Sequence, residues 1–532
     1  MNKWVNFIVV LFILGGFLAA AEEQKTEEPK VEEQKKELSL KDAIYYTLKN
    51  NLDLQVQMRD TEFARKTLKI NNAIFIPTLQ IIGNTFEKNN PPQGVLSGTK
   101  DIVTSQGGSL DFNLSQRLPF GGNVSFDVSS ERGKSNSIYD NPNPALSAQA
   151  QLSLDQPLLK NFGLTPTKQA IYIAANNLDI ARYQLKENIL NLIYNVEEAY
   201  WDLVYAFQNL ETTKMALQRS KDLLKQNEIR VRVGSAAPIE ILTAQADVAM
   251  NESQLIVAEQ SIQTSEELLK RILNMSKENY TIIPTEKPDI KKIDVNFDEF
   301  LAEGLKNRPD VERAKLNLEN SQIGVKYARN QALPSLQLQA AYYTTGRGGD
   351  KKIYKPGKSP LLIDFNPDTD IERIESRAIK FALDDVFKLL YKNFQVQLSL
   401  TMPLSFSLEK AQLAQAKIRR EQAQLSLKNT ENLVYSDIKE AIKALEANGK
   451  LVEANKIAVE LQAERLKAEE KKLSVGLSTN FIVLDYQRQY ANAQTLALQS
   501  FVNYNLTLAR INRILGRTFA VYDINFEDFI NK

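Results

Sequence analysis

Apolar residues recur at every third or fourth position along two long stretches of the chain, residues 168–274 and 410–516. In the first stretch, the apolar residues that would lie along one face of an α-helix are Leu185, Ile189, Leu192, Val196, Ala199 and Leu203. Because residues 168–230 contain no proline and no glycine, we expect a rod of roughly 90 Å from about 60 helical residues. A helix of that length needs partners to cover its apolar stripe, so a long antiparallel coiled coil is expected.

The two stretches are copies of one repeat. A constant offset of 242 residues aligns them without a gap, and the match is closest where each rod breaks. The breaks read Val233-Gly234-Ser235 and Val475-Gly476-Leu477-Ser478, and a glycine at this point is typical of a helix C-terminus. A shorter repeat, at an offset of 257 residues, aligns a helix that begins near Ser39 with one that begins near Asn296. The chain is therefore expected to be a tandem duplication of one structural unit.

Between the short and the long helical segments of each repeat, the period of the apolar residues changes to two. Alternation is clean in residues 110–114, 124–128, 150–154, 336–340 and 396–400. Such alternation, divided by turn residues, is typical of transmembrane β-barrel strands. An ordinary antiparallel sheet with one solvated face would show the same alternation. The long polar connections suit extracellular loops, and the short one at 118–122 suits a periplasmic turn.

These patterns divide the chain into two repeats with short flanking segments. A lysine followed by an apolar core too short to span a bilayer predicts a signal peptide at the start, and the charged run after it predicts a disordered tether. The predicted order is signal peptide 1–21, tether 22–37, first repeat 38–285 with strands in 76–157 and the helical hairpin 168–274, linker 286–294, second repeat 295–516 with strands in 334–404 and the helical hairpin 410–516, and C-terminal tail 517–532.

Composition excludes several kinds of chemistry. The chain has neither cysteine nor histidine, which removes disulfides, thiol chemistry, Cys/His metal sites and histidine-dependent catalysis. Its net charge of +1 gives no reason to expect a nucleic-acid partner. Gly346-Arg347-Gly348-Gly349 is expected in a polar loop and is too weak a signal for phosphate binding. We therefore expect no enzyme activity, no cofactor and no metal.

The order of segments resembles that of the TolC-type outer membrane factors, over nearly all of the chain that follows the predicted signal peptide. The motifs that resemble those of the family are Leu48-Lys49-Asn50-Asn51-Leu52-Asp53, Gln156-Pro157-Leu158-Leu159, Ala199-Tyr200-Trp201, Arg308-Pro309-Asp310 and Val475-Gly476-Leu477-Ser478. The resemblance implies a mixed α and β fold, in which a homotrimer shares one transmembrane β-barrel in the outer membrane and a long α-helical coiled-coil barrel in the periplasm. It also implies a porin-like channel that is the exit duct of a tripartite efflux pump or type I secretion system. Its partners would be a periplasmic adaptor (membrane fusion) protein and an inner-membrane transporter.

The resemblance also points to functional positions near the breaks in the rods. The tips Val233-Gly234-Ser235 and Val475-Gly476-Leu477-Ser478 resemble adaptor-docking loops, with plain helix-breaking turns as the alternative. Asp485 falls on a position where the family narrows its tunnel with acidic rings, and Glu240 is equivalent to Ile482 by the internal offset. Rings of these carboxylates would favour cations, whereas acids near a helix start are common in any case.

Two alternatives remain open at the level of sequence. Three protomers would close a barrel of about 12 strands, as in the family, or of about 18 if the hairpin at 110–128 is in the wall. A non-channel structural coiled-coil protein of the cell envelope is the alternative function, and it accounts for the rods but not for the strands. Candidates for aromatic girdles at the membrane interface are Phe75, Phe86, Phe112, Phe120, Tyr342, Tyr343 and Phe394.

Overall fold

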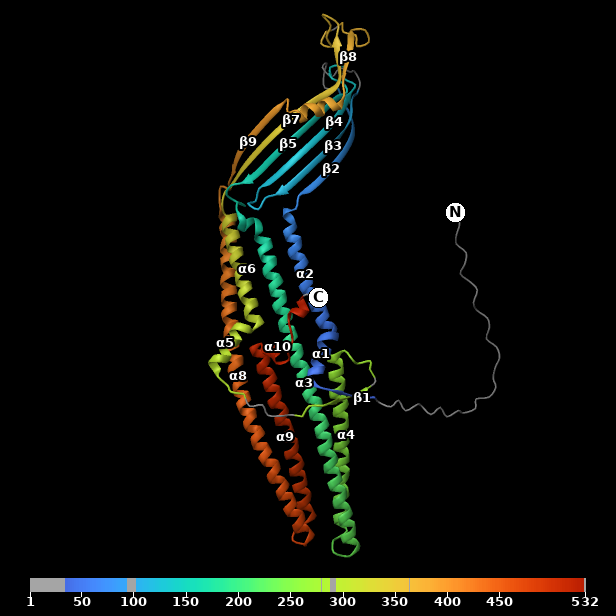
Figure 1. The fold of residues 1–532 in the computed structure, drawn as a ribbon, viewed down its shortest axis with the longest axis vertical. Coiled ribbons are helices and arrows are strands. Elements are labelled where there is room, and N and C mark those ends of the chain that lie inside the picture. The colour runs from blue at the N-terminus through green and yellow to red at the C-terminus, as the bar shows by residue number, and fades with distance from the viewer. Residues whose placement is uncertain (1–33, 93–101, 279, 288–292, 363, 531–532) are drawn as a thin grey trace, which may run out of the picture.

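The computed structural model describes residues 34–92, 102–278, 280–287, 293–362 and 364–530. The molecule is elongated: a curved sheet forms one end, and bundled helices run from it to two hairpin tips at the other end (Figure 1). The predicted signal peptide and most of the predicted tether lie outside the described residues. Within those described ranges, no helix is both long enough and apolar enough to cross a bilayer.

The sheet is antiparallel and draws strands from both repeats. Its strands are β2 (Thr78–Asn90), β3 (Val103–Arg117), β4 (Asn123–Ser135), β5 (Ala145–Pro157), β7 (Ser335–Tyr354), β8 (Ile371–Arg377) and β9 (Lys392–Thr401). Neighbours follow the order β2-β3-β4-β5-β7, after which β9 pairs with the first half of β7 and β8 with its last residues. The hairpin at 110–128 is therefore in the sheet, as β3 and β4, between β2 and β5. Of the seven strands in this described sheet, six cross its body and β8 extends it.

Four long helices of the described chain form two antiparallel hairpins. They are α3 (Leu164–Arg232) with α4 (Ile239–Leu273), and α8 (Ser407–Ser474) with α9 (Asn480–Leu515). α3 has 69 residues and α8 has 68, which gives each a length of roughly 100 Å. Nearer the sheet, α2 and α6 lie beside α3 and α8 in the places that α4 and α9 take nearer the tips (Figure 1). The mixed α and β fold in two tandem repeats is confirmed.

Two of the sequence motifs mark breaks between the shorter helices. These helices are α1 (Leu40–Asn50), α2 (Leu52–Asn72), α5 (Phe297–Asn307) and α6 (Pro309–Gln331). Asn51 separates α1 from α2, and its side chain caps α2 by accepting a backbone N–H at 2.9 Å. Pro309 opens α6, and Arg308 holds this break through ion pairs to Asp310 and Asp437 at 2.7 and 2.8 Å. The motifs around Asn51 and Pro309 thus determine where one helix ends and the next begins.

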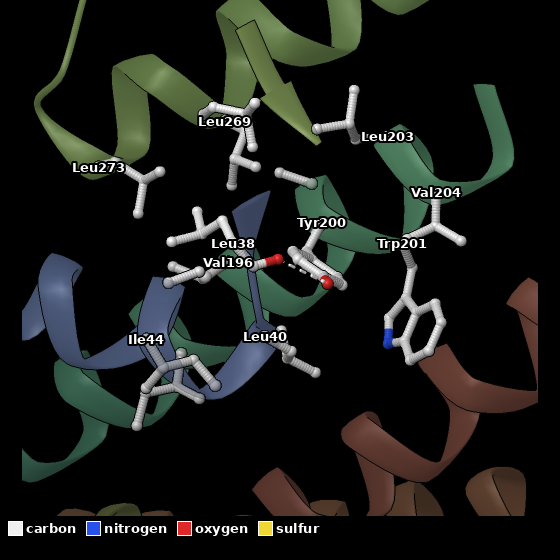
Figure 2. Packing of buried hydrophobic residues seen from close by; sticks show 14 of the residues in the cluster. Leu38, Leu40, Ile44, Val196, Tyr200, Trp201, Leu203, Val204, Leu269 and Leu273 are labelled. Carbon is white, nitrogen blue, oxygen red and sulfur yellow. Dashed lines mark hydrogen bonds between the residues drawn. The ribbon is translucent and has the colours of Figure 1, made fainter. Parts of the chain in front are cut away.

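A core at the waist of the molecule ties the N-terminal segment to the rods. β1 (Gln34–Leu38) pairs in parallel with β6 (Tyr280–Pro284), and the fully buried Tyr200 of α3 donates its hydroxyl hydrogen to the Leu38 carbonyl at 3.0 Å. Figure 2 shows how Leu38, Leu40 and Ile44 pack beside Val196, Tyr200, Leu269 and Leu273. The expectation of a disordered tether is therefore wrong for residues 34–37, because strand pairing and the packing of Leu38 hold this segment in place.

The C-terminal segment closes over the same core. After α9 the chain forms α10 (Thr518–Val521) and α11 (Glu527–Ile530). Between them, Tyr522 donates its hydroxyl hydrogen to the carboxylate of Glu197, in the middle of α3, and Asp523 pairs with Lys41 at 3.3 Å. Burial raises the pKa of Glu197 from its ordinary value of 4.5 to about 7. The predicted tail is thus part of the folded waist.

Candidate functional site

One face of the sheet exposes apolar side chains in rows that run across the strands. The register aligns one row of six residues: Leu79, Leu114, Phe126, Leu152, Tyr342 and Phe394. Their side chains are between 41% and 82% exposed. Neighbouring rows on this face add Ile81, Phe112, Val124, Val128, Leu154, Leu336, Leu338, Val396, Leu398 and Leu400. An exposed apolar area of this extent marks a surface that faces lipid or another protein.

The opposite face of the same strands is polar. One of its rows contains Gln80, Asn113, Asp127, Gln151 and Asn393, and the next contains Ser115, Ser125, Ser153 and Gln395. These side chains bond to one another across the strands, since the hydroxyl oxygens of Ser125 and Ser153 are 2.6 Å apart and Asn113 donates to Asp127. The register also places Phe86 and Tyr343 on this face, so neither belongs to an aromatic girdle on the apolar face.

The two faces decide between the two explanations of the strand pattern. In an ordinary sheet, helices or a second sheet would cover the apolar face. Of the described elements, only α7 (Ile379–Phe387) packs on the apolar face, at the end far from the rods. The edge strands β2 and β9 also pair on one side only within the described chain. Lipid against the apolar face and a second chain at each edge would satisfy both features.

The two hairpin tips share one backbone geometry. Gly234 and Gly476 have φ angles of +78° and +79°, a left-handed conformation that costs little only for glycine. The residue after each glycine bonds back to the last helical turn, from the N–H of Ser235 to the Arg230 carbonyl at 2.8 Å. The N–H of Leu477 bonds in the same way to a carbonyl of α8 at 2.9 Å. This shared turn explains why the two copies match most closely at the tips.

Both tips expose apolar side chains. Val233, Val475 and Leu477 are 71%, 69% and 78% exposed, and Phe481 in the first turn of α9 is 68% exposed. A turn in water requires the glycine but not these side chains, so their exposure favours a contact surface over a plain turn. Adaptor docking at the tips stays a prediction.

Asp485 and Glu240 lie behind the tips in different surroundings. Asp485 is half-buried on α9, and its carboxylate accepts a hydrogen bond from Gln489 at 2.6 Å. Glu240, in the first turn of α4, accepts a hydrogen bond from the side-chain amide of Asn480 at 2.9 Å. Because Asn480 is the first residue of α9, just after the tip of the second hairpin, Glu240 connects the two tips within one chain. A role for either carboxylate in a pore constriction stays a prediction.

Two buried polar residues behind the tips are not singled out by the sequence patterns. Asn227 of α3 is fully buried and donates to the Glu240 carbonyl at 3.5 Å. Glu469 of α8 accepts a hydrogen bond from Ser478 at 2.6 Å, and the hydrogen bonds from Ser478 and Lys472 lower the pKa of Glu469. Positions 227 and 469 are equivalent by the offset of 242 residues. A buried polar residue at the same place in the apolar stripe of both copies is the signal that could have identified Asn227 and Glu469.

A groove of about 630 Å³ lies between the two hairpins, further from the tips. Helices α3, α4 and α9 line it, and its charged residues are Arg219, Asp247 and Arg488. Burial raises the pKa of Asp247, and the Arg488 guanidinium opposes part of that rise. No local pattern predicts this groove, because α9 is far from α3 and α4 in the chain.

Comparison with known proteins finds relatives of one kind. A sequence profile described as "Outer membrane efflux protein" matches residues 123–275 and 301–517. The outer membrane protein TolC of Vibrio cholerae is 20% identical over 334 residues, which are 63% of this chain and 69% of that protein. The pyoverdine export outer membrane protein OpmQ of Pseudomonas aeruginosa is 25% identical over 317 residues, which are 58% of this chain and 65% of that protein.

Solved structures share the architecture at lower identity. The CmeC outer membrane channel of Campylobacter jejuni has a TM-score of 0.62 at 15% identity, covering 90% of this chain and 85% of that chain. The outer membrane protein VceC of Vibrio cholerae has a TM-score of 0.61 at 17% identity, covering 89% of this chain and 95% of that chain. The profile match begins at Asn123, the first residue of β4, so β2 and β3 precede it.

Proposed function

Since this chain belongs to the outer membrane efflux protein family, we propose that it is a trimeric outer membrane channel, the exit duct of a tripartite efflux pump or type I secretion system. The observation that carries the proposal is the exposed apolar face of the sheet, which suits contact with outer membrane lipid. The polar face then lines the lumen, and the helical rods extend the lumen into the periplasm. A non-channel structural protein would leave the apolar face without a role.

The edges of the sheet support a homotrimer. A barrel that spans a membrane leaves no open edge, yet β2 and β9 each have one neighbour in the described chain. β2 runs away from the rods and β9 runs back toward them (Figure 1), so β2 of one copy can pair antiparallel with β9 of the next. Three copies of the six-strand wall would give about 18 strands, a size at which barrels enclose an aqueous channel. The resemblance implies four strands per protomer, and the hairpin at 110–128, which forms β3 and β4, raises this number to six.

The two tips are proposed to bind a periplasmic adaptor that links the duct to an inner-membrane transporter. Leu477→Asp should weaken adaptor binding at least tenfold, because it places an unpaired charge in an apolar contact. The tip itself should still fold, since Leu477 is 78% exposed. The measurement is the dissociation constant of the purified adaptor for the purified trimer. Gln422→Glu adds the same charge to an exposed position on α8 far from the tip, and equal losses in both variants would remove the tips from the contact.

Single-channel conductance of the purified trimer in planar bilayers tests the duct. We expect small, cation-selective steps, and Asp485→Ala should enlarge them and lower their selectivity because it removes a ring of carboxylates from the narrow end. Glu240→Gln tests the second proposed ring. Asp222→Ala is the matched control, because Asp222 also accepts a hydrogen bond from a glutamine one turn away, Gln218, at 2.9 Å.

The outcomes separate the channel from its constriction. If neither Asp485→Ala nor Glu240→Gln changes the conductance steps, the protein is still a channel, but neither carboxylate forms its constriction. A folded trimer that passes no current, in the wild type and in both variants, would contradict the channel and favour the structural coiled coil.

A further inference from the structure

The short helix α7 lies against the apolar face of the sheet, at the end far from the rods. Its residues Ala382 and Val386 are buried against Ala148 of β5. Gly346 of β7 permits this close packing, since a Cβ atom there would lie 1.9 Å from the Ala382 carbonyl oxygen. Ala148 and Gly346 are partners in the register, and Gly346 stands on the same face as Tyr342, four residues earlier on β7. The helix is therefore on the outside of the proposed barrel.

α7 sits at the level where the apolar rows end. On β9, the residue on this face changes from the apolar Phe394 to Lys392 one row further from the rods, opposite Thr344 of β7. Gly346, beneath α7, is one row beyond Thr344. If the apolar rows cross the bilayer, as the proposed function states, α7 lies at the headgroup level of the outer leaflet. The inference drawn below rests on that proposed function.

The side of α7 turned away from the sheet carries aromatic and basic residues. Phe381 and Phe387 are 50% and 70% exposed, and Lys380 and Lys388 are exposed beside them. Phenylalanine is typical of the apolar face that an interfacial helix buries just below the lipid headgroups. Lysine side chains can keep their carbon stems on apolar surface while the ammonium group reaches the headgroups. This combination is typical of a helix that lies in the plane of a membrane interface.

Positive charge dominates the exposed surface around α7. The carboxylate of Asp385 is nearly buried and is neutralised by Arg377, with an N–O distance of 2.7 Å. Asp384 is the other acidic residue of the helix and is half-buried. In the part of the chain that the structure describes, no carboxylate forms an ion pair with Lys380, Lys388 or Lys392.

We propose that α7 is an interfacial helix that binds anionic lipid of the outer leaflet. Phe381 and Phe387 insert among the acyl chains, and the three lysines bind lipid phosphate groups: Lys380, Lys388 and Lys392. Each lysine near an anionic membrane surface strengthens association roughly fivefold. The contact would fix the depth at which the barrel sits, because it joins the upper end of the apolar rows to the headgroup layer.

The depth of α7 can be measured with a tryptophan at position 387. Phe387→Trp, reconstituted in vesicles, should lose most of its added fluorescence to lipids brominated near the headgroup and less to lipids brominated near the chain end. Leu398→Trp, in the middle of the apolar rows and 63% exposed, should show the opposite order. Phe481→Trp at the tip is 68% exposed and should not be quenched. The buried Trp201 gives a common background in all three variants.

Quenching at these three positions tests the placement of α7 separately from the proposed function on which that placement rests. Quenching at position 398 without quenching at 387 would overturn the placement of α7 and leave the duct intact. Absence of quenching at both positions would contradict the membrane placement of the sheet and hence the proposed function.

Phosphate binding is tested by the lipid that stays with the protein. From vesicles of phosphatidylcholine with a minor share of lipid A, the wild-type trimer should retain lipid A in excess of its share. Neutralising Lys380, Lys388 and Lys392 to glutamine should reduce this excess at least tenfold. Lys456, Lys467 and Lys471, exposed on α8 near the tip half of the rod, are neutralised together as the control and should change nothing. Equal retention by the α7 variant and the wild type would refute the phosphate contact.

Discussion

Replacing Leu152 with arginine should destabilise the protein in a membrane by roughly 2–4 kcal/mol per chain, whereas arginine at the neighbouring Gln151 should be tolerated. Leu152 lies in the middle of the apolar row and is 51% exposed. In water, a charge at so exposed a position would cost little. In hydrocarbon, the guanidinium would lose its hydration without gaining a partner. The measurement is urea unfolding of the trimer in vesicles, together with the amount of trimer in outer membrane fractions.

Gln151→Arg is a demanding control because it adds the same side chain one residue away, on the opposite face of β5. The register places Gln151 in the polar row with Asp127 of β4, where a cation meets hydrated polar groups. A similar loss of stability in both variants would indicate a general defect in folding. A loss of stability in Gln151→Arg alone would show that the lipid face and the lumen face are assigned the wrong way round.

Replacing Glu197 with glutamine should stabilise the waist at neutral pH and have little effect in acid. Burial raises the pKa of Glu197 from 4.5 to about 7, so the folded protein binds this proton more tightly than the unfolded chain does. Stability therefore falls as pH rises through the window between these two values and stays low above it. The difference between the folded and unfolded pKa values lowers the free energy of unfolding by about 3 kcal/mol at pH 8. Glutamine keeps an oxygen that can accept the Tyr522 hydroxyl hydrogen.

The midpoint of urea unfolding, followed by the fluorescence of Trp201 between pH 4 and pH 8, checks this expectation. The wild type should lose stability across that range, and Glu197→Gln should lose less of it. Glu198→Gln removes a charge from the next residue, which is exposed, and should keep the wild-type slope. A wild-type slope in Glu197→Gln as well would show that Glu197 ionises in the folded protein as easily as in the unfolded chain.

The rods, the tips and most of the strands follow from local patterns in the sequence. The apolar stripe along α3 repeats over many turns, and the glycines at 234 and 476 end the two rods at equivalent places. Strict alternation in segments such as 150–154 identifies strands because each residue type keeps to one face. The family resemblance adds the membrane and the trimer, which no periodicity can supply.

The features that the sequence patterns do not reveal depend on contacts between distant parts of the chain. β1 has the composition of a charged tether and becomes a strand because β6, more than 240 residues later, pairs with it. α7 is hard to place from its sequence alone, since the apolar Phe387 is exposed while the charged Asp385 is buried. Glu240 has a position that the internal repeat predicts, but its partner Asn480 belongs to the other hairpin.

The two open edges of the sheet also set the order of events in biogenesis. A single protomer cannot offer a finished wall to the membrane, since the unpaired N–H and C=O groups of β2 and β9 would enter hydrocarbon without partners. If three sheets close one barrel, as proposed, insertion has to wait until three chains have met in the periplasm. Its rate should rise steeply with the concentration of newly exported chains, and a cell that makes few copies should accumulate soluble protomers first.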